Sequence, residues 1–284
     1  MKNIFIIFFL IAFTLSAMGQ EKKLTLPSIN NFQKLNNISS SKILRDKNAT
    51  KTKDFSFTIN PYLWTVAMGG TIGVPGIPAS YPQTYEFNKS FSDALKNLKM
   101  AFMVAGKFKY KRVSLLYNLV YFNLKRFGVD IPQGSGLLSA NTTAKELITD
   151  LALSYSFPTK SKSTFIDAYA GTRIWSLESE ISLVPETGST KMNSSSKTWI
   201  DPIVGIHVDF LLSPKYFSYV RSDFGGFNAN SAYNFMIMGG FGYRFSPNFN
   251  TSLGLKYLGL DYNKDGRRFN VNQYGFTISL GYAY

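Results

Sequence analysis

Cysteine is absent from the 284 residues of the chain, and there is a single histidine, His207. No disulfide can therefore staple the fold, and one histidine without thiolates cannot make a transition-metal site. Acidic residues are also scarce, with 17 Asp and Glu against 31 Lys and Arg. We accordingly expect no metal and no cofactor, and a chain whose surface is basic.

Long apolar runs are lacking as well, apart from one at the start. Residues 4–15 are mostly apolar, follow Lys2, and precede the small residues Ser16, Ala17 and Gly19. Such a run is shorter than the roughly 20 residues of a membrane-spanning helix and is typical of an export signal. We assign residues 1–19 to a signal peptide. No later segment could cross a bilayer as a helix, so membrane residence would require a barrel.

Residues 20–53 are rich in Lys, Asn and Ser and show no steady hydrophobic period. This composition predicts a flexible, basic periplasmic tail. A basic chain could bind nucleic acid, but an exported protein does not meet it, and the Lys and Arg residues form no single stripe. We expect no nucleic-acid partner, and instead expect contact with the lipids of the outer membrane.

The sequence is rich in segments where large apolar residues alternate with small or polar ones, most clearly in 272–284 at the C-terminus. Large apolar or aromatic side chains occupy every second position, and Gln273, Gly275, Thr277 and Ser279 lie between them. The apolar set comprises Tyr274, Phe276, Ile278, Leu280, Tyr282 and Tyr284. A period of two is that of a strand, and such an apolar face suits hydrocarbon. An unpaired edge would aggregate, so a closed barrel is favoured.

Similar segments recur throughout 54–284 and predict an all-β, closed antiparallel transmembrane barrel of about 10 strands, within a range of 8 to 12. Short connections are expected at 109–112, 158–163, 213–215 and 246–249, and longer ones at 69–96, 125–145, 183–196 and 261–268. Only 226–232 is short where a long loop was allowed. This rhythm is typical of short periplasmic turns and longer extracellular loops.

Two local features interrupt the rhythm. The apolar positions change parity around Pro61, which predicts a bulge or kink there. Phe91, Ala94 and Leu95 follow Ser90 at helical spacing, which predicts one short helix near the barrel mouth. The three tryptophans, Trp64, Trp175 and Trp199, are interpreted as part of an interfacial girdle.

These features, with the segments Pro61-Tyr62-Leu63-Trp64 and Asp223-Phe224-Gly225-Gly226-Phe227, resemble the small outer-membrane β-barrel proteins of Gram-negative bacteria, of the broad OmpA/OmpW-like kind. The resemblance covers 54–284 and concerns architecture. It implies residence in the cell outer membrane. It also implies that Leu280, Tyr282 and Tyr284 form the signal recognised by the barrel-insertion machinery.

Parity places a set of mainly charged residues of balanced sign on the inner face, with Arg221 and Asp223 the first pair to consider. Either these side chains pair into a network that fills the lumen, or they line a narrow passage or pocket for small solutes. The set comprises Lys99, Asp150, Asp167, Arg173, Asp201, His207, Asp209, Arg221, Asp223, Arg244 and Lys256.

We therefore expect a non-enzymatic barrel with a structural role, or one for the binding or narrow passage of small solutes. Two alternatives remain. One is a barrel hydrolase of lipids or peptides that uses His207 and Asp209. The other is a secreted lipocalin-like binder, whose outer face would be polar. Glu178, Glu180 and Glu186 could hold calcium only if a loop gathered them.

Overall fold

The computed structural model describes residues 54–73 and 75–284. The predicted signal peptide at 1–19 and the basic tail at 20–53 lie outside this part of the chain. In the described residues, no helix has both the length and the hydropathy needed to cross a membrane.

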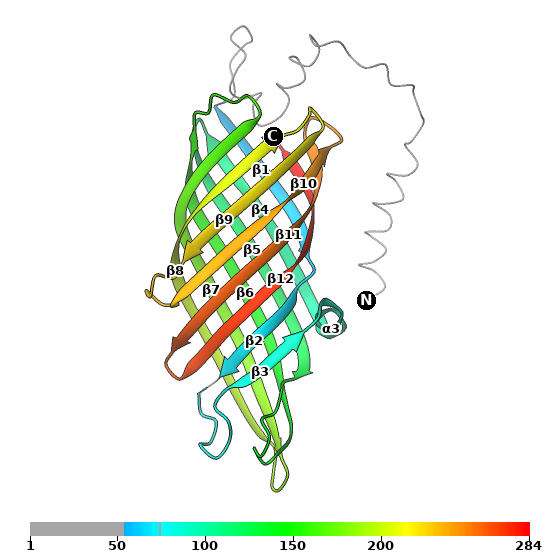
Figure 1. Ribbon diagram of the computed structural model, residues 1–284, viewed down its shortest axis with the longest axis vertical. Helices are drawn as coiled ribbons and strands as arrows, with labels where there is room; N and C mark the ends of the chain where they lie inside the picture. Colours follow the sequence, from blue (N-terminus) through cyan, green and yellow to red (C-terminus); the bar gives the residue numbers. More distant parts are fainter. Residues whose placement is uncertain (1–53, 74) are drawn as a thin grey trace, which may run out of the picture. The chain divides into compact units, whose positions relative to one another are not determined.

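Ten antiparallel strands form a closed ring, as expected (Figure 1). Each strand pairs with its neighbour in sequence, and the ring closes where the first strand pairs with the last. The strands are β1 (Phe55–Trp64), β4 (Leu98–Tyr110), β5 (Val113–Gly128), β6 (Leu137–Phe157), β7 (Thr164–Pro185), β8 (Lys191–Leu211), β9 (Tyr216–Gly225), β10 (Tyr233–Arg244), β11 (Phe249–Lys264) and β12 (Arg267–Ala283). The predicted barrel is confirmed, and 272–283 lies in its closing strand.

The connections after β4, β6, β8 and β10 are short and lie at one end of the barrel, at the top of Figure 1. Short turns mark the periplasmic end of a transmembrane barrel, so we call the opposite end the outer end. The strands that extend furthest toward that end are β6, β7 and β8, with total lengths of 21, 22 and 21 residues. The outer connections are 129–136, 186–190, 226–232 and 265–266.

The expected loops at 125–145, 183–196 and 261–268 are therefore largely strand, and these predicted boundaries were wrong. Leu137, Ile181 and Leu183 point inward and are buried, so the outer end has an apolar core of its own that keeps the strands paired. Asp265 and Gly266 join β11 to β12 with φ values of 55° and 69°. Positive φ at both positions is what a two-residue type I′ hairpin turn requires.

The predicted bulge at Pro61 is absent from the described strands. β1 pairs with β12 from Thr58↔Ala283 to Trp64↔Thr277, and β2 (Ala67–Gly73) continues in the same register. The apolar residues change face because the barrel interior changes, from polar at the periplasmic end to apolar at the outer end. Pro61 instead lies at the last pair that β1 makes with β4.

A small hairpin and the predicted helix occupy the segment between β1 and β4. β3 (Tyr85–Lys89) pairs with β2, and α3 (Phe91–Asn97) follows. Ser90 caps α3 in a capping box: its hydroxyl accepts a hydrogen bond from the Asp93 amide, and the Asp93 carboxylate accepts one from the Ser90 amide. The helix lies against β2, β3 and β5 on the outside of the barrel (Figure 1). The helix prediction is confirmed.

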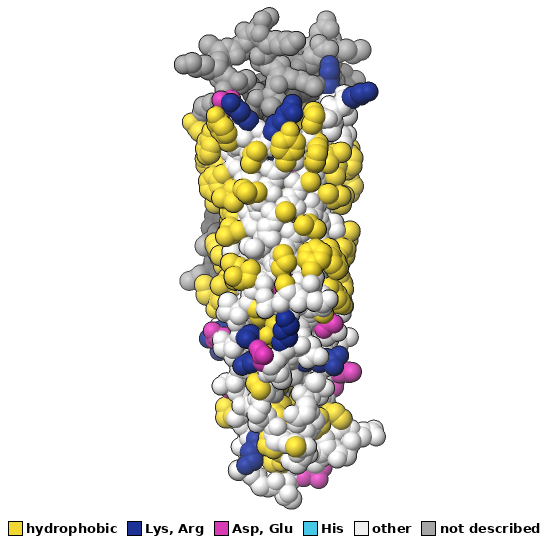
Figure 2. Space-filling view, turned by 90° about the vertical axis from the view of Figure 1, so that its left-hand side faces the viewer, with side chains coloured by type: hydrophobic (Ala, Val, Ile, Leu, Met, Phe, Trp, Pro, Cys, Tyr) yellow, Lys and Arg dark blue, Asp and Glu magenta, His cyan; other side chains and the backbone are white. Residues whose placement is uncertain are grey.

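Large apolar side chains cover the outer face of the strands. Figure 2 shows them as a broad band that ends at a belt of Lys, Arg, Asp and Glu. Phe241 and Phe276 are 70% and 60% exposed and belong to this band. Soluble monomers rarely expose contiguous apolar patches above a few hundred Å², and lipid is the solvent that suits such a band. The lipocalin-like alternative required a polar outer face and is not supported.

The interior has two zones. In the outer half an apolar core runs from Val120 and Ile148 to Tyr262 and Phe269. In the middle of the barrel, charged and amide side chains replace it. Trp64, Trp175 and Trp199 lie inside and are 5%, 1% and 4% exposed. The expected tryptophan girdle was therefore wrong, because these side chains belong to the apolar core, where it meets Asp201 and Lys256 of the charged zone.

Candidate functional site inside the barrel

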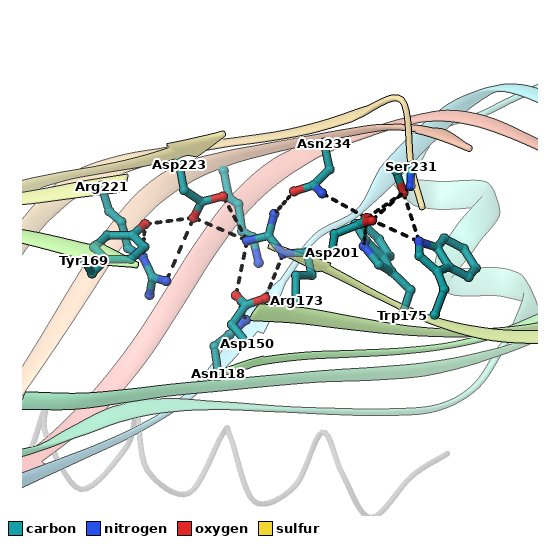
Figure 3. A network of polar contacts seen from close by, with 12 residues as sticks. Asn118, Asp150, Tyr169, Arg173, Trp175, Asp201, Arg221, Asp223, Ser231 and Asn234 are labelled. Carbon is teal, nitrogen blue, oxygen red and sulfur yellow. Dashed lines mark hydrogen bonds and ion pairs between the residues drawn. The ribbon is translucent and has the colours of Figure 1, made fainter. Parts of the chain in front are cut away.

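Arg173 is the centre of the polar zone (Figure 3). It projects inward from β7 and stands opposite Asp150 of β6 in the strand register. Its Nε donates to Asp150 Oδ1 at 2.7 Å, its Nη1 to Asn234 Oδ1 at 2.9 Å, and its Nη2 lies 3.0 Å from Asp223 Oδ1. The planar guanidinium thus links β7 to β6, β9 and β10.

Asp201 lies next in the network, toward the outer end. Its carboxylate accepts hydrogen bonds from Trp175 Nε1 at 3.0 Å, from Asn234 Nδ2 at 3.0 Å, and from the backbone amide and hydroxyl of Ser231 at 2.9 and 2.5 Å. Trp199 Nε1 adds a contact of 3.3 Å. These donors compensate for taking the charge out of water.

Tyr169 and Arg221 extend the network toward the periplasmic end. Tyr169 Oη donates to Asp223 Oδ2 at 2.8 Å and accepts from Arg221 Nε at 2.9 Å. Arg221 Nη2 lies 4.0 Å from the same carboxylate, so the expected Arg221 and Asp223 pair is in place.

Lys256 joins from the other side of the lumen. Its ammonium lies 4.3 Å from the centroid of Trp64 and 3.4 Å from the hydroxyl of Tyr62, which donates to Asn118 Oδ1. Asn118 in turn donates to Asp150 at 3.1 Å. Three carboxylates (Asp150, Asp201, Asp223) and three cations (Arg173, Arg221, Lys256) therefore share one network of zero net charge.

A second and wetter group of charges lies nearer the periplasmic turns. Lys107 Nζ is 3.6 Å from Asp167, and His207 Nε2 is 3.1 Å from Asp209. The His207 ring stacks on Tyr219. His207 and Asp209 retain side-chain exposures of 24% and 28%. Arg244 lies over the ring of Phe217 instead of joining a carboxylate.

The structure thus divides the expected inward set. Asp150, Arg173, Asp201, Arg221, Asp223 and Lys256 meet in the central network, while Asp167, His207 and Asp209 lie in the periplasmic group. Lys99 takes part in neither: it is exposed at the irregularity where β4 shifts register between Leu98 and Met100. The register shift explains the difference, because it breaks the parity from which its orientation was inferred.

An apolar cavity lies on the outer side of the network, inside the barrel mouth. Its walls include Phe87, Phe122, Phe127, Trp175 and Leu258. The volume that the centre of a water-sized molecule can occupy in it is about 60 Å³. By the same measure, one buried water needs roughly 10–15 Å³. The cavity can therefore hold a small organic group.

Glu146 and Gln273 are the polar residues at this cavity that matter most for a ligand. They are 6% and 5% exposed, and Gln273 Nε2 donates to Glu146 Oε2 at 2.5 Å. Neither was among the expected site residues: Glu146 follows directly after the loop expected at 125–145, and Gln273 was counted only as one of the polar residues between the apolar positions of 272–284. The inward parity of Glu146 with Asp150 was the available signal.

Acidic side chains do not gather into a metal site in the described part of the chain. Glu178 and Glu180, considered as calcium ligands, pair with Lys145 at 2.8 Å and with Arg126 at 3.8 Å on the outer face. Both are ordinary exposed ion pairs.

The closed strands, the lipid-facing band and the filled interior define a transmembrane β-barrel. No family model and no curated protein matches the sequence. Solved structures similar to it include the outer membrane protease OmpT from Escherichia coli, at 11% identity and a TM-score of 0.49, with 84% of this chain and 99% of that chain covered. The outer membrane protein OprG from Pseudomonas aeruginosa is similar at 11% identity and a TM-score of 0.37, with 81% of this chain and 95% of that chain covered. Neisserial surface protein A is similar at 12% identity and a TM-score of 0.32, with 81% of this chain and 97% of that chain covered. At such identities the likeness says nothing about activity.

Proposed function

We propose that this protein is a non-enzymatic outer-membrane barrel that binds a small, mainly apolar solute in its outer cavity. The observation that carries the proposal is a cavity with aromatic walls that lies on the outer side of the ion network and has the buried acid Glu146 in its lining. Pockets of this kind, largely apolar with a few convergent polar groups, are typical of small-molecule sites. Trp175 lines the cavity and donates to Asp201, so the network holds one wall of the site in place.

Passage through the lumen, the other role expected for a charge-lined barrel, is less well supported. Asp201, Arg173, Asp223 and Asp150 are 0%, 1%, 2% and 3% exposed, so the middle of the barrel is packed and leaves these side chains almost no contact with water. Opening a path would require breaking several buried ion pairs, each of which leaves an uncompensated charge. The network therefore favours a structural plug.

Hydrolysis by His207 and Asp209 would require a nucleophile beside the imidazole. Among the described residues, no Ser or Thr hydroxyl forms a hydrogen bond with His207, and its ring is stacked on Tyr219. The pair is also separated from the outer cavity by the network. These positions favour a binding role over catalysis.

The test uses the purified, refolded full chain. In planar bilayers we expect no steady conductance, and in a solute-binding assay we expect small aromatic compounds to change the fluorescence of Trp175, which lines the cavity. Ala144→Phe should fill the cavity and abolish that change. Ala170→Phe, on the exposed face of β7, is the matched control and should bind as the natural chain does. Steady conductance, or binding that survives Ala144→Phe, would contradict the proposal.

A further inference from the structure

We infer that the solute taken by the outer cavity is a small apolar amine whose ammonium group pairs with Glu146. This inference rests on the proposed binding function and names the chemical class of the ligand. It starts from the way the buried carboxylates of the barrel are compensated.

Each central carboxylate is compensated by several donors or by a cation. Asp150 and Asp223 share Arg173, and Asp201 accepts hydrogen bonds from Trp175, Ser231 and Asn234. A buried carboxylate without such partners is strongly unfavourable. The partners of these three carboxylates can therefore be compared with those of Glu146.

Glu146 has fewer partners than the three central carboxylates. It accepts one hydrogen bond, from Gln273 Nε2, and within the described part of the chain no Lys, Arg or His lies within 4.0 Å of its carboxylate. Lys256, a buried cation of the same interior, is engaged by the Trp64 ring and the Tyr62 hydroxyl. Glu146 is thus a buried acid that lines a cavity and forms no ion pair, although the charge of Lys256 acts on it from beyond 4.0 Å.

Gln273 further limits which chemical group of a ligand can fit at this end of the cavity. Its side-chain carbonyl, Oε1, is buried and forms no hydrogen bond with the described residues. The floor of the cavity therefore presents acceptors: the Glu146 carboxylate and the Gln273 carbonyl. A ligand group that fits must donate hydrogen bonds, and an ammonium also supplies the missing positive charge. A carboxylate or phosphate group would meet repulsion.

The rest of the ligand must be apolar and small, because the walls are Phe, Trp and Leu side chains and the space is limited. A single aromatic ring on a short amine meets both conditions. An aromatic wall adds favourable contacts for a ring and for a cation.

The experiment compares three compounds of nearly equal shape on the refolded full chain: benzylamine, benzyl alcohol and benzoate. Binding is measured by isothermal titration calorimetry in lipid nanodiscs, with empty nanodiscs as blank. We expect benzylamine to bind best and benzoate least. Glu146→Gln should weaken benzylamine about 10-fold or more, since a charge-assisted hydrogen bond is lost, and should leave benzyl alcohol nearly unchanged.

Glu180→Gln is the matched control, because Glu180 is an exposed carboxylate of β7 outside the cavity. It should leave benzylamine binding unchanged, and β-sheet circular dichroism confirms that each variant is folded. Equal binding of benzylamine and benzyl alcohol, unaffected by Glu146→Gln, would overturn the amine assignment and leave the proposed function intact. If none of the three compounds binds the natural chain, the proposed function fails as well.

Discussion

At the residue scale, Arg173 stabilises the middle of the barrel by compensating the buried carboxylates there. Its guanidinium contacts Asp150 and Asp223 and donates to Asn234, all of them buried. Replacing it by Met keeps much of the volume and removes the charge, which leaves the carboxylates uncompensated. We expect Arg173→Met to lower the free energy of unfolding by about 3–5 kcal/mol, measured by urea titration in lipid vesicles.

The control for that variant is Arg126→Met. Arg126 pairs with Glu180 at 3.8 Å on the exposed face, with 53% of its side chain accessible. Exposed pairs contribute at most about 1 kcal/mol, so this variant should unfold almost as the natural chain does. Equal effects of the two substitutions would mean that the central network contributes no more than a surface pair.

The tryptophans provide a second residue-scale prediction. The chain has three, and all three lie inside the barrel. A girdle at the membrane surface would contact lipid tails and headgroups, whereas interior side chains do not. We expect brominated lipids to quench the intrinsic fluorescence only weakly, while Phe276→Trp, on the exposed face, should introduce a strongly quenched component. Strong quenching of the natural chain would contradict the interior placement.

At the element scale, α3 depends on its N-cap. The hydrogen bond from the Ser90 hydroxyl holds the pKa of Asp93 below its usual value of 3.8, and the Ser90 amide acts in the same direction. A carboxylate with a lowered pKa stabilises the folded form above its unfolded pKa and loses that effect as the pH falls through the folded one. The capping box should therefore be intact at neutral pH and open on acidification below about pH 4.

Amide NMR of the protein in bicelles can follow this opening at Ala94, whose amide donates to the Ser90 carbonyl. Ser90→Ala should bring the Asp93 midpoint back toward 3.8 and increase amide exchange in α3 roughly five-fold, because an N-cap is lost. A substitution of Ser92, which is exposed and outside the capping box, should change neither. An unchanged midpoint in Ser90→Ala would show that the cap does not act on Asp93.

The elements also show what a sequence can reveal about a barrel. Lipid requires an unbroken apolar face, so Phe276 and Ile278 could be oriented by parity alone. In the outer half the interior is apolar too. Beyond the lipid-facing band the outward side chains are polar, such as Glu178 and Glu180 of β7. The apolar face of the strand is then the inner one. Apolar character alone therefore gives Trp175 the wrong side, and the same change of face imitates a bulge at Pro61.

The site required more than orientation. Gln273 lies 127 residues after its partner Glu146. Parity states that both point inward, but only the register of the strands states that they lie at the same level. Asp150 and Arg173 illustrate the same point, since they are direct partners across β6 and β7. The sequence could therefore predict that these charges lie in the lumen, and that Arg221 and Asp223 of one strand are neighbours, but not which charges pair across strands.

At the scale of the whole molecule, closure joins the two ends of the described chain. Tyr284 exchanges backbone hydrogen bonds with Phe57 at 3.2 and 3.0 Å, and the two rings lie 5.9 Å apart. The last residue therefore completes the ladder between β12 and β1. Without it the seam loses two hydrogen bonds and an aromatic contact at the periplasmic end, and the proposed insertion signal of Leu280, Tyr282 and Tyr284 loses its final residue.

Deleting Tyr284 should consequently reduce the amount of protein assembled in the outer membrane, as measured by heat-modifiable mobility of membrane fractions. Tyr216→Ala is the control, since Tyr216 is an aromatic of the same end, 56% exposed, in a strand that does not close the ring. Refolding into pure lipid vesicles separates the two causes. A loss at the seam alone slows refolding there as well, whereas a loss of the insertion signal leaves vesicle refolding intact and reduces assembly only in cells. Normal assembly of the deletion in cells would contradict both roles of Tyr284.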